Sequence, residues 1–352
     1  MPETSQHPKR FKSMINTERS QVEIERVGMT GRIGIKDVAE LAGVSAGTVS
    51  KVLKNYSGVS EETRRKVMEV VERTGYIPNS VASALSSKTN KRIALFIYVN
   101  DKMQQIDEIN MLFILGAFDR ARKDGLELIT VFNASIENLS NEETAGYFHS
   151  THVDTVIAFG LNKNDEKIHY LAKEGGMNLV VVDAYLEGDN VSTVMIDHSL
   201  GQYETAEQIC SEGSRVLYIK GKEDGYVSDM RLEGMMKLAE DKKLDLRIES
   251  GEFSEEKAYE IVKNAGEEFD AIVCASDLMA IGARRALPKD SKVKVSGFDG
   301  IRLMEYAAAD VITCRQDFYN IGSAAVEAAE KLLRGGKGEN VSIPYSVTKM
   351  SR

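Results

Sequence analysis

Residues 35–88 constrain the fold of this 352-residue chain more than any other stretch. Apolar residues recur there at helical spacing, and Gly43 ends the first helical run because glycine readily adopts the backbone of a tight turn. Ser45 is suited to cap a second helix, and Ser60 a third. Three short helices with one shared apolar face predict a small all-α domain of helix-turn-helix type, which we place at residues 33–78.

The outer face of the second helix consists of small and hydroxylated residues with one basic residue. Its members are Ser45, Ala46, Gly47, Thr48, Ser50 and Lys51. A helix with such a face can approach base edges in the major groove, and its hydroxyl groups can donate hydrogen bonds to phosphates. The pattern indicates DNA binding. A plain three-helix packing module has the same helix–glycine–helix arrangement and stays an alternative.

Residues 79–90 follow Pro78 and connect the helical domain with the rest of the chain. This segment is too short to be stable as an isolated helix, because such helices are marginal below about 12 residues. One interpretation is a flexible linker between domains. The other is a hinge helix that folds only against DNA and inserts its large apolar residue, Leu85, between base pairs of the minor groove.

Residues 35–88 resemble the headpiece of the LacI/GalR family of bacterial transcriptional regulators. The segments that agree in residues and in spacing are DVAELAGVS, TVSKVL, VSEETRRKV, GYIPN and VASAL. The resemblance implies that the outer face of the second helix contacts operator DNA and that Ala82 and Leu85 are the minor-groove residues of a hinge helix. It also implies a homodimer on a near-palindromic operator, with a small-molecule effector.

The charges of the chain are unevenly distributed. The net charge is −9, but residues 32–92 carry 11 basic and 6 acidic side chains, a balance of +5. Residues 1–31 carry 5 basic and 4 acidic side chains, a balance of +1, so the remaining residues carry −15. A basic domain on an acidic body confines the attraction for phosphate to one end of the chain.

Other features of the sequence exclude classes of protein. No run of about 18 apolar residues is present, so we expect no membrane span. The N-terminus has no apolar export signal, so we expect a cytoplasmic protein that associates with the nucleoid when it is bound to DNA. Cys210, Cys274 and Cys314 lack the spacing of metal ligands, so we expect reduced and packed thiols, no metal and no cofactor.

Residues 1–30 are polar and show no helical or strand periodicity. We expect a disordered extension there. Such an arm could contact DNA or a partner, or it could be an artefact of the start site, because Met29 lies just ahead of the helical domain.

From residue 92 onward strands alternate with helices, which predicts a different fold class. Predicted strands lie at 92–100, 126–132, 155–159 and 179–183, and then at 216–220, 246–250, 271–274 and 294–297. Predicted helices lie at 111–124, 141–149, 166–173, 200–212, 230–241, 255–264, 278–285 and 321–334. Apolar strands separated by helices are typical of parallel sheets that are buried on both faces. Two such runs predict an α/β body of two doubly wound parallel sheets.

The body, residues 91–352, resembles the periplasmic sugar-binding-protein fold that this family carries as its effector-binding and dimerisation domain. Its best motifs are RLEG at 231–234, ASDLMAIG at 275–282, GFDG at 297–300 and RQDF at 315–318. The resemblance implies two lobes, about 91–196 with 316–342 and 197–315 with 343–352, joined by crossovers near residues 196, 315 and 343. Three crossovers form a hinge, so that a ligand between the lobes can close them.

Five polar residues and one aromatic residue near the expected carboxyl ends of strands form the candidate effector site, because ligands of doubly wound sheets bind there. These residues are Asp183, Ser276 and Asp299 after strands, Arg231 at a helix start, Phe253 after a strand and Gln316 at a crossover. Carboxylates accept hydrogen bonds from hydroxyl groups, arginine donates, and an aromatic ring packs on a sugar face, so the set suits a sugar or nucleoside. Structural alternatives exist: Asp299 could cap a turn with Gly300, and Arg231 could form a surface ion pair.

The resemblance implies effector contacts at the same six positions, of which that of Asp183 comes from the binding-protein relatives. The sequence departs from the family at two places. Ser276 stands where family members often carry asparagine, and Ile109 and Asn110 replace an aromatic pair that is usual before the first helix of the body. The contribution of the first lobe to the site therefore stays open.

Two other functions compete with a regulator. A sugar- or nucleotide-processing α/β enzyme fused to the helical domain would carry catalytic motifs. The sequence has no P-loop, no GxGxxG after the first strand and no GxSxG, so we expect no catalytic residues. A solute-binding protein would have a signal peptide and no helical domain. The sequence favours a ligand-responsive, sequence-specific DNA-binding regulator, which we expect to be a repressor.

Overall fold

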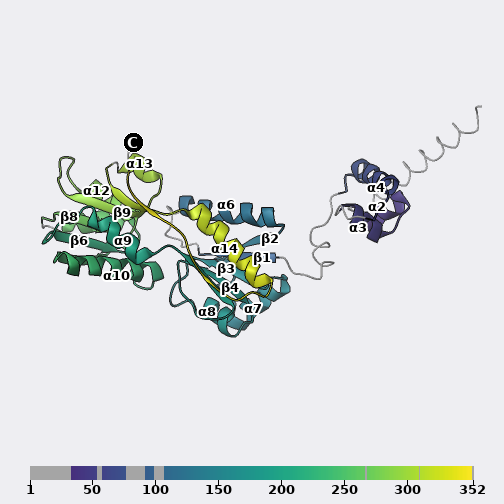
Figure 1. Cartoon of the computed structure of the whole chain (residues 1–352), viewed down its shortest axis with the longest axis horizontal. Coiled ribbons are helices and arrows are strands. Elements are labelled where there is room, and N and C mark those ends of the chain that lie inside the picture. The colour runs from purple at the N-terminus through teal and green to yellow at the C-terminus, as the bar shows by residue number, and fades with distance from the viewer. Residues whose placement is uncertain are drawn as a thin grey trace, which may run out of the picture. The chain divides into compact units, whose positions relative to one another are not determined.

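The structure is a computed structural model that describes residues 33–53, 58–76, 92–98, 107–265, 268–308 and 310–350. The chain forms two compact units, Met1–Thr89 and Asn90–Arg352 (Figure 1). The extension expected at 1–30 and the expected hinge residues Ala82 and Leu85 lie outside the described residues.

The described part of the first unit, the headpiece, is all-α. Its helices are α2 (Ile35–Ala42), α3 (Ala46–Leu53) and α4 (Glu61–Thr74). The buried side chains Val38, Val49 and Val67 come one from each helix and form a common core. The predicted all-α helix-turn-helix fold is confirmed.

Local sequence signals set the ends of these helices. α2 ends at Gly43, which has the left-handed φ of +65° and whose amide donates to carbonyls of the last helical turn. Ser60 caps α4 by accepting a hydrogen bond from the amide of Thr63, and Gly75 ends α4 in the left-handed conformation. The helix end at Gly43 and the cap at Ser60 that the sequence predicts are confirmed.

The first lobe of the second unit is built on a parallel sheet with the strand order β11-β5-β4-β3-β1-β2. Its strands are β1 (Arg92–Ile97), β2 (Glu127–Phe132), β3 (Thr155–Phe159), β4 (Asn178–Val182), β5 (Val191–Met195) and β11 (Asn340–Ser342). Its helices are α6 (Asp107–Asp124), the short 3-10 helix η1 (Asn133–Ser135), α7 (Asn141–Ser150), α8 (Glu166–Lys173) and α14 (Phe318–Leu333).

The sheet of the first lobe is covered on both faces. Alternate residues of β1 point to opposite sides, so Ile93 and Leu95 pack in the cluster formed with α6 and α14. Ala94 and Phe96 pack in the cluster formed with α7 and α8. Figure 1 shows α6 and α14 side by side over the sheet. This double burial explains the continuous apolar runs of the strands.

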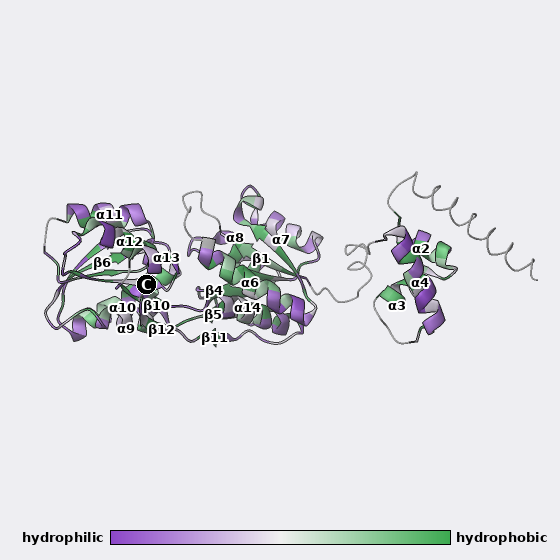
Figure 2. Ribbon diagram, turned by 90° about the horizontal axis from the view of Figure 1, so that it is seen from above, coloured by the Kyte–Doolittle hydropathy of each residue, from purple (hydrophilic) through white to green (hydrophobic). Residues whose placement is uncertain are grey.

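The second lobe is built on a sheet with the strand order β12-β10-β9-β8-β6-β7. Its strands are β6 (Arg215–Lys220), β7 (Asp245–Ser250), β8 (Ala271–Cys274), β9 (Lys294–Asp299), β10 (Ile312–Arg315) and β12 (Ser346–Lys349). Its helices are α9 (His198–Glu207), α10 (Tyr226–Asp241), α11 (Glu255–Asn264), α12 (Asp277–Ala286) and α13 (Leu303–Ala307). Figure 2 shows α9 and α10 on one side of the sheet and α11 and α12 on the other.

The chain passes between the two lobes three times. The connections run from β5 to α9, from β10 to α14 and from β11 to β12. The predicted fold class, with two doubly wound sheets and three crossovers, is confirmed.

Several elements of the body differ from the prediction. The strands β5, β10, β11 and β12 and the helix α13 were not predicted, because each is short and polar residues interrupt its apolar run. The four-residue strand β8 was predicted, since all of its residues are apolar. β12 pairs with β10 in the antiparallel direction, which corrects the expectation of a wholly parallel second sheet. The helix predicted at 200–212 is α9, and it begins earlier because Asp197 caps it by accepting a hydrogen bond from the Leu200 amide.

Candidate functional site

The outer face of α3 carries the residues that the sequence assigns to DNA. Ser45, Gly47 and Lys51 are exposed, whereas Thr48 and Ser50 are half-buried. Ser45 accepts a hydrogen bond from the Thr48 amide at 3.2 Å, and the two hydroxyl oxygens lie 2.9 Å apart. The start of α3 carries accessible hydroxyl groups, and its small side chains let the helix backbone come close to DNA. Such a helix start suits phosphate contacts.

Ala46 differs from the other members of this face. Its side chain is half-buried and packs against the core of the headpiece. The Ala46 methyl group therefore contributes to packing inside the headpiece. Lys51 has the longest exposed side chain on this face of α3.

Five side chains form a hydrogen-bonded series, called the interlobe chain here: Asp183, His198, Arg231, Asp299 and Gln316. His198 Nε2 lies 2.8 Å from Asp183 Oδ1, and Arg231 Nε donates to His198 Nδ1 at 3.3 Å. Arg231 Nη2 lies 3.2 Å from Asp299 Oδ1, and Gln316 Nε2 donates to the same oxygen at 3.0 Å. Asp183 follows β4 of the first lobe and Arg231 lies on α10 of the second, so the series connects the lobes.

His198 is neutral in this series. An arginine can only donate, so His198 Nδ1 accepts and the proton lies on Nε2, which donates to Asp183. Burial lowers the pKa of His198 below its ordinary value, and the neighbouring Asp183 carboxylate only partly opposes this effect. The imidazole stacks on Phe298 with ring centres 5.7 Å apart. The packing and the pKa therefore agree on one uncharged tautomer.

Arg231 is held entirely by groups of the protein. Its residue surface is 4% exposed, so the alternative of a surface ion pair is wrong. Besides Asp299 and His198, it donates from Nη1 to the Ala275 carbonyl at 2.5 Å. The guanidinium also lies 3.8 Å from the centre of the Phe298 ring, a cation–π contact. A charged group at this depth is tolerated because partners surround it.

Two buried carboxyl groups lie on the second-lobe side of the interlobe chain. Burial raises the pKa of Asp299 to about 6, and the Arg231 charge acts in the opposite direction. Burial and the charge of Asp299 raise the pKa of Asp277 well above its ordinary value. Asp277 accepts hydrogen bonds from the Thr313 hydroxyl at 2.7 Å and from the Ile301 amide at 2.9 Å. The two groups therefore resist simultaneous ionisation.

The GFDG motif at 297–300 makes room for this carboxyl pair. A Cβ atom on Gly297 would lie 2.3 Å from Asp277 Oδ1, which only glycine avoids. The side chain of Asp299 bonds to Arg231 and Gln316, whereas the Gly300 amide donates to another partner, the Thr313 hydroxyl.

Three of the six predicted effector residues have a left-handed backbone. Their φ angles are +55° at Asp183, +60° at Phe253 and +119° at Asp299. Such a conformation costs a non-glycine residue about 1–3 kcal/mol and tends to occur at functional sites. Four residues outside the candidate site, His152, Lys243, Glu252 and Asp310, share this conformation, so it is a feature of these three effector candidates but does not by itself mark the site.

Ser276 and Phe253 lie outside the interlobe chain. Ser276 is buried and caps α12 by accepting a hydrogen bond from the Met279 amide at 3.3 Å. Phe253 is half-buried, and its ring would lie 2.1 Å from a Cβ atom on Gly221. The structure therefore brings Asp183, Arg231, Asp299 and Gln316 together, whereas Ser276 and Phe253 lie outside this hydrogen-bonded series.

Sequence reasoning missed His198, the residue that joins Asp183 to Arg231. His198 begins α9, immediately after its capping residue Asp197 and three positions after the end of β5. β5 pairs with β4, which ends just before Asp183. A prediction of β5 would have placed His198 beside Asp183 at the same edge of the sheet.

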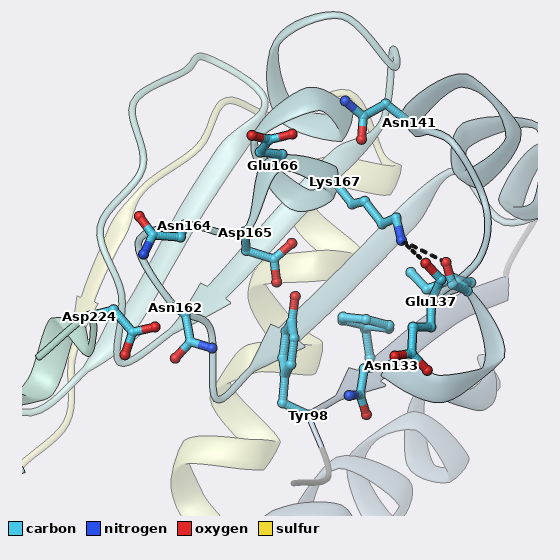
Figure 3. A pocket seen from close by; sticks show the side chains of 12 residues that line it. Tyr98, Asn133, Glu137, Asn141, Asn162, Asn164, Asp165, Glu166, Lys167 and Asp224 are labelled. Carbon is cyan, nitrogen blue, oxygen red and sulfur yellow. Dashed lines mark hydrogen bonds between the residues drawn. The ribbon is translucent and has the colours of Figure 1, made fainter. Parts of the chain in front are cut away.

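A polar cavity of about 410 Å³, called the lobe 1 cavity, lies at the carboxyl ends of β1, β2 and β3 (Figure 3). Its lining residues are Phe96, Tyr98, Asn133, Ile136, Glu137, Asn141, Asn162, Asn164, Asp165, Glu166, Lys167 and Asp224. None of the six predicted effector residues is among them. The signal in the sequence is the recurrence of asparagine and aspartate after two strands of the sheet, Asn133 after β2 and Asn162, Asn164 and Asp165 after β3.

The second lobe contacts the first beside this cavity. Asn162 and Gly225 form an antiparallel bridge, and the Lys163 amide donates to the Asp224 carbonyl at 3.0 Å. The Lys163 ammonium also forms an ion pair with Asp229 of α10. The lobes therefore touch at the cavity as well as at the interlobe chain.

Among the residues that the structure describes, no group of three or more His, Cys, Asp or Glu side chains is arranged to hold a metal ion. None of the helices in this described part is both long enough and apolar enough to cross a membrane. The three cysteines are buried and unpaired with one another.

Two sequence models of protein families match the chain. The model of bacterial regulatory proteins of the lacI family matches residues 34–79, and the model of periplasmic binding proteins and the sugar-binding domain of the LacI family matches residues 119–322, more than half of the chain. The chain belongs to the LacI family. It is therefore a ligand-responsive, DNA-binding transcriptional regulator, and the resemblance found in the sequence is confirmed.

Individual relatives cover nearly the whole chain. The HTH-type transcriptional regulator RegA of Clostridium saccharobutylicum is 29% identical over 321 residues, which cover 85% of this chain and 92% of RegA. The lac repressor dimer bound to operator and the anti-inducer ONPF has a TM-score of 0.77 at 23% identity, over 91% of this chain and 99% of that one. The complex of the transcriptional regulator CelR with cellobiose has a TM-score of 0.66 at 23% identity, over 91% and 100%.

Proposed function

We propose that this regulator represses transcription by binding a near-palindromic operator as a homodimer, under the control of a small polyhydroxylated effector. The observation that carries the proposal is the accessible, hydroxyl-rich face of α3 in a unit that matches the lacI family model. The CelR–cellobiose complex supports the effector class, and the operator-bound lac repressor dimer supports the assembly. The relatives are regulators by name, which supports a chain that acts on nucleoid DNA in the bacterial cytoplasm and has no catalytic function.

On the DNA side, the proposal assigns direct contacts to the hydroxyl groups and the ammonium of α3. The residues concerned are Ser45, Thr48, Ser50 and Lys51, with Ala46 and Gly47 as the small residues that let the backbone approach base edges. Contacts of this kind fix the register on the duplex through phosphates and read bases at short range.

On the effector side, the proposal places ligand hydroxyl groups against Asp183, Arg231, Asp299 and Gln316, with Phe253 and Ser276 on the second-lobe side. Gln316 Oε1 is buried and makes no hydrogen bond among the described residues, which leaves an acceptor for a ligand hydroxyl. A ligand that takes over hydrogen bonds of the interlobe chain changes how the lobes are connected. That change is the differential contact that couples effector binding to operator affinity.

The homodimer is proposed to form through the outer face of α6. Met111, Leu115 and Phe118 are spaced by four and three residues, so they share one helix face, and they are 59%, 50% and 41% exposed. Phe132 is also exposed at the end of β2, an edge strand of the first sheet. Exposed apolar side chains on one helix face, in a lobe whose sheet ends in an open edge strand, are typical of an interface between protein molecules.

The DNA assignment is tested by selecting duplexes from a random pool with the purified full chain and then measuring the affinity for the selected site. Lys51→Glu should lower that affinity at least about tenfold, because it replaces a phosphate-binding cation by an anion. Arg65→Glu, an equal change of charge at an exposed position of α4, is the matched control and should have a much smaller effect. Equal losses in the two variants would remove α3 from the DNA surface.

The dimer assignment is tested by the molar mass in solution, measured by light scattering. Leu115→Glu should convert a dimer to a monomer and should weaken operator binding, because the two headpieces are no longer linked. Met236→Glu changes an exposed residue of α10 in the same way and should leave the mass unchanged. A monomeric wild type, or a dimeric Leu115→Glu variant, contradicts the assignment.

A further inference from the structure

The lobe 1 cavity is distinct from the interlobe chain. Both lie at the carboxyl edge of the first sheet, but the interlobe chain begins at β4 and the cavity lies beyond β3, β1 and β2, toward the other end of the strand order. We propose that this cavity binds an uncharged or amine-bearing polyhydroxylated ligand and rejects anionic ones such as sugar phosphates. The inference rests on the proposed function, because it names the chemical class of the effector and adds the lobe 1 cavity to the interlobe chain as a place where the effector is bound.

The lining of the cavity accepts hydrogen bonds more readily than it donates them. Among the described residues of the lining, the carboxylates are Glu137, Asp165, Glu166 and Asp224, the amides are Asn133, Asn141, Asn162 and Asn164, and the single cation is Lys167. Carboxylates only accept, so a ligand that satisfies them must bring hydroxyl or ammonium donors. The formal balance of these groups is −3, which attracts cations and repels anions.

Two lysines in the described part of the chain, Lys167 in the lining and Lys163 beside it, are already bonded to groups of the protein. Lys167 Nζ donates to the carbonyls of Ile136 and Glu137 at 2.8 and 2.7 Å, as the dashed lines in Figure 3 show. Lys163, at the contact with the second lobe, is paired with Asp229. A phosphate or carboxylate would have to break one of these interactions to obtain a positive partner.

Two helices, α7 and α8, begin beside the cavity, and carboxylates of the protein already occupy their N-terminal ends. Asp165 caps α8 by accepting a hydrogen bond from the Ile168 amide, and Glu166 lies in the first turn. Ser140 and Glu143 form a capping box at the start of α7. A helix start attracts anions through its free amides, but these starts carry carboxylates of the protein itself. Neither helix therefore offers an anion site.

The size and the shape of the cavity suit a sugar. A volume of about 410 Å³ lies within the range of ligand pockets, roughly 300–1,000 Å³. The ring of Tyr98 stands over one side, and Figure 3 shows its hydroxyl pointing toward the Asp165 carboxylate. Asp224 comes from the second lobe, so a ligand here touches both lobes and can influence their closure.

A fluorescence titration tests the position of the ligand. The chain has no tryptophan, so Tyr98→Trp in the full-length protein places the only tryptophan in the cavity, where it can be excited selectively over the tyrosines. The probes are glucose, galactose and mannose, each as the neutral sugar, the 2-amino sugar and the 6-phosphate. On at least one scaffold the neutral or amino form should change the emission and bind at least about tenfold more tightly than the phosphate, the effect of one unit of charge in a polar site. Tyr306→Trp on α13 is the matched control and should not respond.

The possible outcomes separate the inference from the proposed function. Equal or tighter binding of the phosphate, or no response of Tyr98→Trp to any neutral or amino sugar, overturns the inference. If a sugar changes operator affinity while Tyr98→Trp stays silent, the proposed function stands and the cavity is not its ligand site. Loss of operator binding by the wild type under all conditions refutes the proposed function instead.

A change of charge tests the selectivity without altering the aromatic wall. Asn164→Lys adds a cation at an exposed position of the lining and should shift the ratio of phosphate to amino-sugar affinity toward the phosphate by about tenfold. Asn264→Lys, an equal change at an exposed position of α11 in the other lobe, should leave the ratio unchanged. Equal ratios in the two variants overturn the electrostatic basis of the proposal.

Discussion

The two lobes share one architecture but differ in the burial and the bonding of their charged groups. In the second lobe, Arg231, Asp277 and Asp299 are buried and bonded to protein groups, while Gln316 follows at the crossover. In the first lobe, the polar residues of the lobe 1 cavity are half-buried or exposed around an open space. A buried charge costs several kcal/mol unless its partners stay in place, roughly as for the ion pairs measured in other proteins. The second lobe therefore has a fixed polar element, and the first lobe has groups that can exchange partners with a ligand.

The interlobe chain and the lobe 1 cavity also differ in their distance from the crossovers between the lobes. The interlobe chain lies at β4, next to β5, from which the chain passes to the second lobe. The lobe 1 cavity lies at the other side of the sheet, where the lobes touch through Asn162 and Gly225. In a hinged pair of bodies the displacement grows with the distance from the hinge. A small rearrangement of the interlobe chain can accompany a large change at the cavity.

Arg231→Ala should have the largest effect on the stability of the body. It leaves the carboxylate of Asp299 buried without its cation and removes the donor to His198, so the free energy of unfolding should fall by about 3–5 kcal/mol. Urea denaturation of the full chain measures this. Arg334→Ala, which removes the exposed pair with Glu330, is the control and should cost less than about 1 kcal/mol. Similar small losses in both would show that the two lobes do not differ in the way described.

Asp277→Asn should change how stability depends on pH. The unfolded carboxyl ionises near 3.8, whereas the folded one keeps its proton to a higher pH. The unfolded chain therefore holds fewer protons within that window, and this group lowers the free energy of unfolding as the pH rises through it. Asparagine has no proton to lose, so the variant should gain at least about 1.4 kcal/mol relative to the wild type between pH 4 and pH 8.

Comparing the Asp277→Asn variant with the wild type separates the effect of Asp277 on the free energy of unfolding from that of His198. The folded pKa of His198 is lowered, so that group favours the fold above its ordinary pKa and loses stability as the pH falls below it, in both proteins alike. A constant difference between the two proteins from pH 4 to pH 8 would mean that Asp277 is ionised in the fold, with ordinary surroundings.

The sequence predicts the headpiece in more detail than it predicts the body. In the headpiece the signals are local: Gly43 ends a helix, Ser60 caps one, and apolar spacing defines the core. In the body the long buried strands were predicted, since their apolar runs are continuous. The short strands β5 and β10 were not, because their position depends on pairing with residues far away in the sequence.

The candidate site shows the same division. Asp183, Arg231, Asp299 and Gln316 were selected one by one, and the structure brings them together, but their roles toward an effector stay predictions. The sequence could not predict that groups of the protein use the donors of Arg231, because these contacts depend on packing between α9, α10 and β9. The lobe 1 cavity was missed since asparagines after strands are common in loops.

Asp165→Ala should have a moderate and local effect in the first lobe. Asp165 caps α8, so loss of the cap should lower the free energy of unfolding by about 1 kcal/mol. Asp165→Asn keeps an acceptor for the Ile168 amide and is the matched control, with an expected loss of only a few tenths of that value. Both variants would be compared by urea denaturation. A loss of several kcal/mol in either one would mean that the first lobe also depends on a buried charged network.

Lys163→Ala should have the smallest effect on the free energy of unfolding. It should have a larger effect on the contact between the two lobes at the lobe 1 cavity. The ion pair with Asp229 joins the lobes but both side chains are partly exposed, so its loss should cost no more than about 0.5 kcal/mol. Because solvent ions screen such a pair, the difference from the wild type should vanish near 1 M salt, where the screening length is about 3 Å. Small-angle scattering at low salt should show a larger radius of gyration for the variant, since one of the contacts that holds the lobes together at the lobe 1 cavity is gone. An unchanged radius at low salt would mean that the bridge between Asn162 and Gly225 is enough to hold this side closed.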